Sequence, residues 1–236
     1  LVLAEYDLEN QVDEINAAAV AHARTAIQGR KNCYVAGSVG PTTKLPSLGH
    51  VSVDALYDSL REQMRALLKA GVDALIIETC QDLLQVKVAL VACFEVLEDL
   101  GRELPVLVSV TMERQGTMLV GSDIAAICAT LEPFPIFSLG LNCATGPSDM
   151  ASHIRYLSHN WPQRISCMPN QGLPEVVDGK THYPMQPEDF VHHMRQFIEK
   201  DGVSIVGGCC GTTPDHIRQL AAVCSGLSPA KREVTV

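Results

Sequence analysis

Apolar side chains recur at helical spacing in some stretches of the chain and run without interruption in others, and the two patterns alternate. The first helical pattern places Val12 and Ile15 on one face and ends near residue 27. The second is opened by Ser52, a candidate N-cap, and closed by Gly71. Further helices are predicted at residues 82–100, 123–131, 148–157, 187–200 and from Thr213 onward.

Between these helices lie short runs of valine, isoleucine and leucine, which are typical of strands covered on both faces of a parallel sheet. The runs occupy residues 33–41, 74–78, 106–111, 136–143, 165–170 and 203–208. A long polar loop is predicted after the fifth of these strands. Strand and helix alternate through the whole chain, which predicts an α/β fold, either a (β/α)₈ barrel or a doubly wound sheet.

The number of predicted strands is smaller than a closed barrel needs. A TIM barrel has eight strands, whereas this chain begins with a helix and offers six. We therefore expect a (β/α)₈ barrel whose first two βα units are missing from this chain. A G-x-G-x-x-G loop after an early strand would indicate a dinucleotide-binding fold, and the sequence has none. The barrel is expected over residues 1–225, with residues 226–236 as a linker or tail.

The amino-acid composition disfavours some classes of binding partner. The chain has 236 residues and a formal net charge of −9, without a lysine or arginine cluster, which disfavours nucleic acid and anionic membranes as partners. No apolar run approaches the roughly 18 residues of a membrane span, and the N-terminus resembles no signal peptide. The nine cysteines are expected to be reduced thiols of a cytoplasmic protein. Four of them are expected to be small buried hydrophobes: Cys33, Cys93, Cys128 and Cys224.

Chemistry is expected at the carboxyl ends of the strands, where folds of this kind bind ligands. The residues at these ends are Ser38, Gly40, Glu78, Thr111, Asn142, Cys143, Asn170, Cys209 and Cys210. Three thiols on one rim indicate zinc, which prefers thiolate ligands in a tetrahedral arrangement. Three protein ligands would leave the fourth position to a substrate. The alternative is that the adjacent cysteines form a vicinal disulfide or are two packed thiols.

The residues around the adjacent cysteines support a metal site. Gly207, Gly208 and Gly211 supply the backbone freedom that two neighbouring ligands require. The helix that starts at Thr213 points its N–H groups at this corner, which favours ionised thiols. Three thiolates give zinc a net charge near −1, and such a zinc is better suited to holding an incoming thiol than to activating water. The pattern therefore predicts alkyl transfer to sulfur, with Asn142 bracing the loop.

Five motifs together resemble the homocysteine S-methyltransferase domain family. They are "AGSVGPT" (36–42), "IIET" (76–79), "GLNCATGP" (140–147), "MPNQGLP" (168–174) and "GGCCGTTPDHI" (207–217). The resemblance runs from the first helix to about residue 223. Within the family, the motifs are most similar to the homocysteine-binding module of cobalamin-dependent methionine synthases.

The resemblance implies a barrel whose zinc is held by Cys143, Cys209 and Cys210 and whose substrate is homocysteine, methylated on sulfur to methionine. It also implies that Glu78 binds the substrate amino group and that Asn170 lines the site, where its amide oxygen is a candidate fourth zinc ligand when no substrate is bound. Ser38 and Thr111 complete the set of expected substrate-binding residues. The family's first two strands, which take part in amino-acid binding, have no counterpart in this sequence.

The methyl donor stays open at this point. For the nearest type of relative it is methylcobalamin on a partner domain, with cobalamin- and folate-binding domains in the same polypeptide. Other members of the family use betaine, S-methylmethionine or S-adenosylmethionine. Two further interpretations compete: a zinc–thiolate barrel that acts on a different thiol, and an incomplete, non-catalytic scaffold that binds zinc or thiols.

Overall fold

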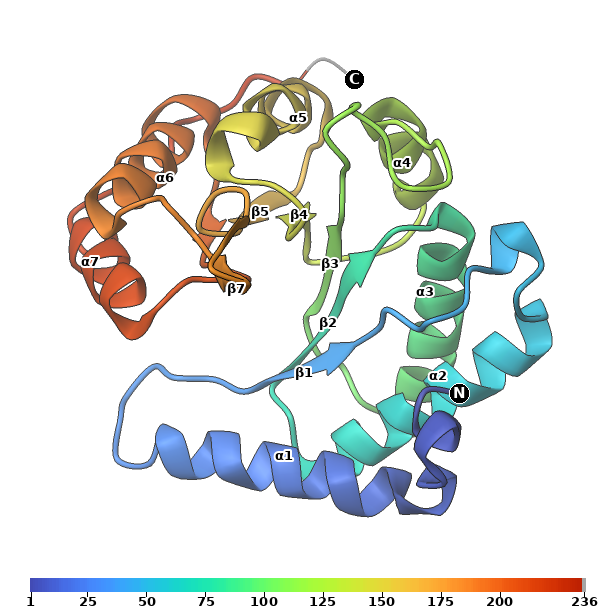
Figure 1. The fold of residues 1–236 in the computed structure, drawn as a ribbon. Helices are drawn as coiled ribbons and strands as arrows, with labels where there is room; N and C mark the ends of the chain where they lie inside the picture. The colour runs from blue at the N-terminus through green and yellow to red at the C-terminus, as the bar shows by residue number, and fades with distance from the viewer. Residues whose placement is uncertain (235–236) are drawn as a thin grey trace. The chain divides into compact units, whose positions relative to one another are not determined.

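The computed structural model of the chain describes residues 1–234. Parallel strands alternate with helices (Figure 1), which confirms the α/β class. The described residues form two compact units: residues 1–108 with 134–136, and residues 109–133 with those from 137 onward. The assignment of residues 1–225 to one barrel domain stays a prediction. None of the helices within residues 1–234 combines the length and the apolarity that crossing a membrane requires.

The first unit holds three long helices and two paired strands. Its elements are η1 (Leu3–Tyr6), η2 (Glu9–Gln11), α1 (Val12–Ala26), β1 (Ala36–Val39), η3 (Pro46–Leu48), α2 (Val53–Ala70), β2 (Ala74–Cys80), α3 (Leu83–Asp99) and the start of β3 (Val106–Val110). Strands β1 and β2 are parallel, with Ala36 opposite Ala74 and Val39 opposite Ile77. This register brings the carboxyl ends of the two strands side by side.

The ends of α2 lie where the sequence places them. The Ser52 hydroxyl accepts a hydrogen bond from the backbone N–H of Ala55 at 3.2 Å, which satisfies one of the free donors of the first turn. Gly71 ends the helix in the left-handed conformation, with φ of 86°. Between these ends, Leu56 and Met64 are fully buried in the core of the unit. The helix therefore packs its predicted apolar face and exposes the opposite one.

The second unit carries the other strand ends. Its elements are the end of β3, α4 (Ile124–Leu131), β4 (Ser138–Asn142), α5 (Pro147–Asn160), β5 (Arg164–Met168), β6 (Glu175–Val177), β7 (Lys180–His182), α6 (Pro187–Asp201), β8 (Ile205–Val206) and α7 (Pro214–Cys224). Strand β5 is parallel to β4 on one side and to β8 on the other, so that Cys167 lies opposite Leu141 and Val206. The carboxyl ends of β4, β5 and β8 are therefore neighbours.

Strands β4 and β5 come very close at Gly140. A Cβ atom on Gly140 would lie 2.0 Å from the carbonyl oxygen of Ser166 and 2.1 Å from its hydroxyl oxygen. Real side chains do not tolerate such distances, and the neighbouring atoms include backbone. The position therefore requires glycine for space, in a strand whose five residues are all buried.

The long polar segment predicted as a loop between β5 and α6 contains a hairpin that the sequence analysis did not predict. Strands β6 and β7 form an antiparallel hairpin in which Val176 lies opposite Thr181. Its turn is made by Asp178 and Gly179, both with positive φ. Asp-Gly is the pair that a two-residue hairpin turn of this type favours. The local turn chemistry therefore outweighs the polar composition of the segment.

The last strand is shorter than the sequence pattern predicts, and the tail makes contacts of its own. Strand β8 covers only Ile205 and Val206, because the chain then turns through two glycines toward the adjacent cysteines. In the tail, the Arg232 guanidinium donates to the carbonyl of Trp161 at 2.6 Å, and the Ala230 N–H donates to the Ile198 carbonyl at 2.9 Å. These residues thus lie against α5 and α6, and the assignment of residues 226–236 as a linker stays a prediction.

Candidate metal centre

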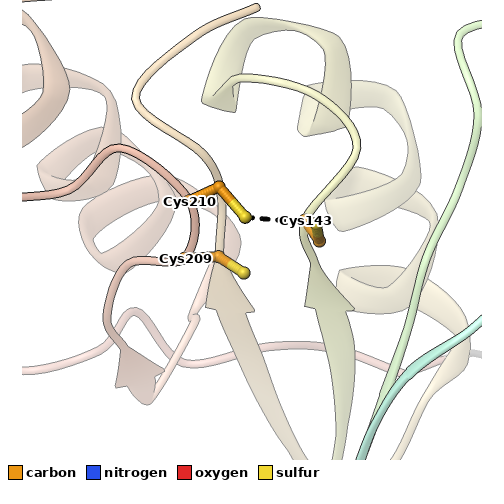
Figure 2. Close-up of side chains that lie close together, drawn as sticks. All are labelled: Cys143, Cys209 and Cys210. Atoms are coloured by element: carbon orange, nitrogen blue, oxygen red, sulfur yellow. Dashed lines mark hydrogen bonds between the residues drawn. The ribbon is translucent and has the colours of Figure 1, made fainter. Parts of the chain in front are cut away.

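The ends of β4 and β8 bring three cysteines together. Cys143 directly follows β4, and Cys209 and Cys210 lie in the loop after β8. Their sulfur atoms all lie within 4.8 Å of one another (Figure 2). The Sγ atoms of Cys143 and Cys210 are 3.9 Å apart. The cluster therefore assembles thiols that are far apart in the sequence.

The geometry of the cluster fits a zinc ion. Zinc–thiolate bonds of about 2.3 Å in a tetrahedron place the sulfur atoms roughly 3.8 Å apart, and the Cys143–Cys210 distance is 3.9 Å. Cys210 is exposed, whereas Cys143 and Cys209 are half-buried, and none of the three forms a disulfide. The side next to Cys210 thus stays accessible to a further ligand. A vicinal disulfide, the competing interpretation of the adjacent cysteines, is not formed in this structure.

The backbone at Cys143 is held in an uncommon conformation. Cys143 and the following Ala144 both have positive φ, 63° and 56°. The Thr145 N–H donates to the Cys143 carbonyl at 2.7 Å, which closes a tight turn. A non-glycine residue in this region costs of the order of 1–3 kcal/mol and persists only where its surroundings impose it. After this turn the Cys143 sulfur lies 3.9 Å from that of Cys210, the contact drawn as a dashed line in Figure 2.

Asn170 connects the loops that carry the cysteines. Its side-chain oxygen accepts a hydrogen bond from the Cys210 N–H at 3.0 Å. Its own N–H donates to the Thr145 carbonyl at 3.1 Å. The residue is buried, with 4% of its surface exposed, so its amide is fixed in position. The role of Asn170 as a substrate contact or fourth zinc ligand stays a prediction, because its amide oxygen here braces the backbone of a candidate ligand.

The three thiols share their charge unequally. A hydrogen bond from Cys209 lowers the pKa of Cys143 to about 5, against the opposing effect of burial. The same hydrogen bond, together with burial, raises the pKa of Cys209. Burial and the charge of Cys143 raise the pKa of Cys210. Without a metal, the neighbouring thiols thus favour the ionised form of Cys143 over the ionised forms of Cys209 and Cys210.

Thr111 and Asn142 support the end of β4. The Thr111 hydroxyl donates to the Asn142 carbonyl at 3.0 Å and is buried. The Asn142 side chain donates to the Cys209 sulfur at 3.8 Å, in agreement with the expectation that it braces the loop. The role of Thr111 in substrate binding stays a prediction, because its hydroxyl proton is used on the backbone next to Cys143.

In the first unit, Ser38 and Glu78 form a pair. The Ser38 hydroxyl donates to the Glu78 carboxylate at 2.6 Å, across the parallel pairing of β1 and β2. The Gln63 amide donates to the Ser38 carbonyl at 3.2 Å. Glu78 is half-buried and Ser38 is exposed. The structure thus joins the two residues that the sequence assigns to substrate binding in this unit, and the assignment itself stays a prediction.

Sequence reasoning missed Tyr183, which lies just after β7. Its ring packs against Gly211, the residue after the adjacent cysteines: a Cβ atom on Gly211 would lie 2.5 Å from the ring. Burial, followed by the nearby charges of the three cysteines, raises the pKa of Tyr183. The Asp-Gly turn of the hairpin is the sequence signal that could have indicated an ordered segment here.

Comparisons with known proteins show which family the chain resembles. The family model described as homocysteine S-methyltransferase matches residues 2–224. The methionine synthase of Mycobacterium leprae is 43% identical over 226 residues, which are 93% of this chain and 19% of that protein. The methionine synthase of Mycobacterium tuberculosis is 41% identical over 238 residues, which are 99% of this chain and 20% of that protein. The chain thus spans about a fifth of the length of these relatives.

Solved structures show the same fold. The apo crystal structure of the homocysteine methyltransferase MmuM from Escherichia coli has a TM-score of 0.71 and 25% identity, and the match covers 91% of this chain and 74% of that chain. The metallated form of the same protein gives a TM-score of 0.71 and 24% identity, and the match covers 94% and 75%. The predicted α/β, TIM-barrel-like architecture is confirmed by this likeness. With its model matched over residues 2–224, the chain belongs to the homocysteine S-methyltransferase family.

Proposed function

We propose that this chain transfers a methyl group to the sulfur of homocysteine, giving methionine, with zinc held by Cys143, Cys209 and Cys210. The observation that carries the proposal is the cluster of three thiols, all within 4.8 Å of one another, at strand ends of a member of this family. The distance of 3.9 Å between the Cys143 and Cys210 sulfurs suits zinc, and Cys210 is exposed, where a substrate thiol can reach it. The metallated form of the Escherichia coli relative is in line with a metal centre.

The chemistry follows from the donor set. Cys143, Cys209 and Cys210 would hold the zinc, which would supply a Lewis acid that favours the ionised form of a substrate thiol at neutral pH. The sulfur loses its proton to solvent and forms a bond to the methyl carbon. The bond between that carbon and the donor breaks, and its electron pair stays with the donor. The contribution of the chain is to hold the ligands in place: the Asn142 amide donates to the Cys209 sulfur, and the Asn170 side-chain oxygen accepts from the Cys210 N–H.

Glu78 and Ser38 are the candidates for the substrate amino group. A carboxylate is the natural partner of an ammonium ion, and the Ser38 hydroxyl fixes one of its oxygens at 2.6 Å. The other carboxylate oxygen of Glu78 can then accept from the substrate. Asn170 is assigned to the substrate on the family resemblance, and Thr111 on its position at the end of a strand.

We place this chain as a module of a longer methionine synthase that uses methylcobalamin. In this proposal, methylcobalamin lies on another domain of the same polypeptide and is recharged by methyltetrahydrofolate on a folate-binding domain. The names and the greater length of the mycobacterial relatives support this arrangement. The nine thiols are all free, which suits the reducing cytoplasm. Betaine, S-methylmethionine and S-adenosylmethionine are the competing donors.

The test combines metal analysis with an assay of methyl acceptors and donors. The chain is purified under reductant, its zinc is measured, and homocysteine is offered with methylcobalamin or with each competing donor. We expect zinc in a one-to-one ratio with the chain and methionine formation with methylcobalamin. Cysteine as acceptor is the control for specificity. A folded chain without zinc and without methyl transfer would contradict the proposal and favour the scaffold interpretation.

A further inference from the structure

Strand β2 ends on a backbone conformation that threonine rarely adopts. Thr79, the next-to-last residue of the strand, has a φ of 59° and so lies in the left-handed region. A β-branched residue in this region is an outlier, because its side chain crowds the backbone. Such a residue keeps its conformation only where its surroundings impose it. The residue before it is Glu78, so whatever imposes the turn at Thr79 also acts on Glu78.

Cys80 closes this turn. Its thiol donates to the Glu78 carbonyl at 3.6 Å, a hydrogen bond that reaches back across Thr79. Cys80 is buried, with 1% of its surface exposed. Burial raises the pKa of Cys80 to about 12, so the thiol keeps the proton that it donates. The turn is therefore held by a thiol that takes no part in the proposed metal centre.

Neighbouring segments keep Cys80 in this position. A Cβ atom on Gly40, the residue after β1, would lie 3.3 Å from the Cys80 sulfur, so the end of β1 covers the thiol. Two residues beyond Cys80, Asp82 is fully buried. Its carboxylate accepts from the Ser47 N–H at 2.9 Å and from the Ser47 hydroxyl at 2.7 Å. The backbone on the far side of the turn is thus fixed by contacts with two other segments of the unit.

We propose that Cys80 is a positioning residue for the substrate: by holding the strained turn at Thr79, its buried thiol sets the direction in which Glu78 presents its carboxylate. This inference rests on the proposed function, in which Glu78 binds the substrate ammonium. Glu78 is held at two points, its carbonyl by Cys80 and its carboxylate by the Ser38 hydroxyl at 2.6 Å. An extended conformation at Thr79 would relieve the strain, break the first contact and turn Glu78 away.

The first test removes the sulfur and measures homocysteine binding. Zinc-loaded wild-type chain and Cys80→Ala are titrated with homocysteine in a calorimeter, and KM and kcat are measured with methylcobalamin as donor. We expect the affinity to fall and KM to rise by roughly 3- to 5-fold at unchanged kcat, because the carboxylate is still present but points in other directions. Cys80→Ser, whose hydroxyl can donate to the same carbonyl, should recover most of the affinity. Cys93→Ala is the matched control, because Cys93 is also fully buried in the first unit, within α3.

A second variant tests the role of the strain. Glycine adopts the left-handed conformation without cost, so the turn should persist without its thiol when residue 79 is glycine. The double variant Thr79→Gly/Cys80→Ala should therefore bind homocysteine more tightly than Cys80→Ala, and Thr79→Gly alone should bind it as the wild type does. In a Glu78→Gln background, Cys80→Ala should cause no further loss, since Cys80 is proposed to act through Glu78.

Three outcomes would overturn the inference and leave the proposed function intact. They are unchanged affinity in Cys80→Ala, failure of Thr79→Gly to restore the affinity, and a loss that persists in full in the Glu78→Gln background. Should the alanine variant not fold, as judged by circular dichroism, Cys80→Val makes the same comparisons, because valine fills the space but cannot donate. A zinc-loaded wild-type chain that neither binds homocysteine nor forms methionine would overturn both proposals.

Discussion

The strand ends of the two units are built in different ways. In the first unit, β1 and β2 end in Ser38 and Glu78, which a hydrogen bond of 2.6 Å joins. In the second unit, the cysteines after β4 and β8 lie on strained or glycine-flanked backbone, and the loop after β5 ties them together through Asn170. The same βα architecture thus places one hydrogen-bonded pair of polar side chains at the strand ends of the first unit. At the strand ends of the second unit it places three thiols on backbone that neighbouring loops hold in position. The difference fits what each unit is proposed to bind: an ammonium ion tolerates variable geometry, whereas a tetrahedral metal does not.

The largest expected effect comes from removing a thiol of the cluster. Cys143→Ser, Cys209→Ser or Cys210→Ser should each remove most of the zinc and abolish methyl transfer, because two thiolates hold zinc far less well than three. The loss should exceed the 10–100-fold that an outer hydrogen bond contributes. Zinc per chain and methionine formation are the measurements. Cys33→Ser is the matched control, and full activity in any one of the three variants would exclude the three-thiolate site.

A smaller effect is expected in the first unit. Glu78→Gln removes the charge proposed to meet the substrate ammonium, so the KM for homocysteine should rise by about 10-fold or more. The zinc content should stay unchanged, since Glu78 is proposed to bind the substrate rather than the metal. Ser38→Ala should raise KM less, because it removes only the hydrogen bond that orients the carboxylate. Loss of zinc from Glu78→Gln would show that its assignment to the substrate is wrong.

The smallest expected effect is a difference in reactivity between thiols of the unmodified sequence. Burial raises the pKa of Cys80 and Cys93 to about 12, whereas its neighbours lower that of Cys143 to about 5. In metal-free chain at pH 7, iodoacetamide should therefore modify Cys143 before Cys80 or Cys93, since thiolates are the reactive form. The rate at Cys143 should fall as the pH falls through about 5. Peptide mapping by mass spectrometry gives the order, and earlier modification of Cys93 would contradict it.

Much of this arrangement could be predicted from the sequence, because local rules and topology agree there. Ser52, Gly71 and Thr213 mark helix ends through capping chemistry that depends only on neighbouring residues. The meeting of Cys143 with the adjacent cysteines follows from parallel strands, whose carboxyl ends share one edge. The burial of the cysteines was predicted less well. Cys93 and Cys128 are buried as expected, but Cys33 and Cys224 are only half-buried. A short apolar run does not indicate how deeply a cysteine within it is buried.

The parts that the sequence did not predict depend on contacts between distant segments. Thr111 and Asn170 stabilise the backbone because the Asn142 carbonyl and the Cys210 N–H lie within hydrogen-bonding distance of their side chains. Those partners belong to other segments, so the local sequence does not predict them. Tyr183 was missed because its partner, Gly211, lies in another loop, and a tyrosine in a polar segment has no periodicity to mark it. The Asp178-Gly179 pair could have been recognised as a turn from the sequence. A turn alone, however, does not indicate that this segment lies next to the cysteines.

The crowding at Gly140 has a consequence for genetics. Even alanine at this position would collide with Ser166, so nearly every substitution should disrupt β4 and displace the cysteine that follows it. In a growth selection for methionine prototrophy, Gly140 would thus score as intolerant as the cysteines themselves. A mutational map based on growth alone would therefore classify Gly140 as a catalytic or metal-binding residue. A parallel screen for protein abundance would distinguish Gly140 from the cysteines. Abundance should fall for Gly140 variants and stay unchanged for serine replacements of the thiols.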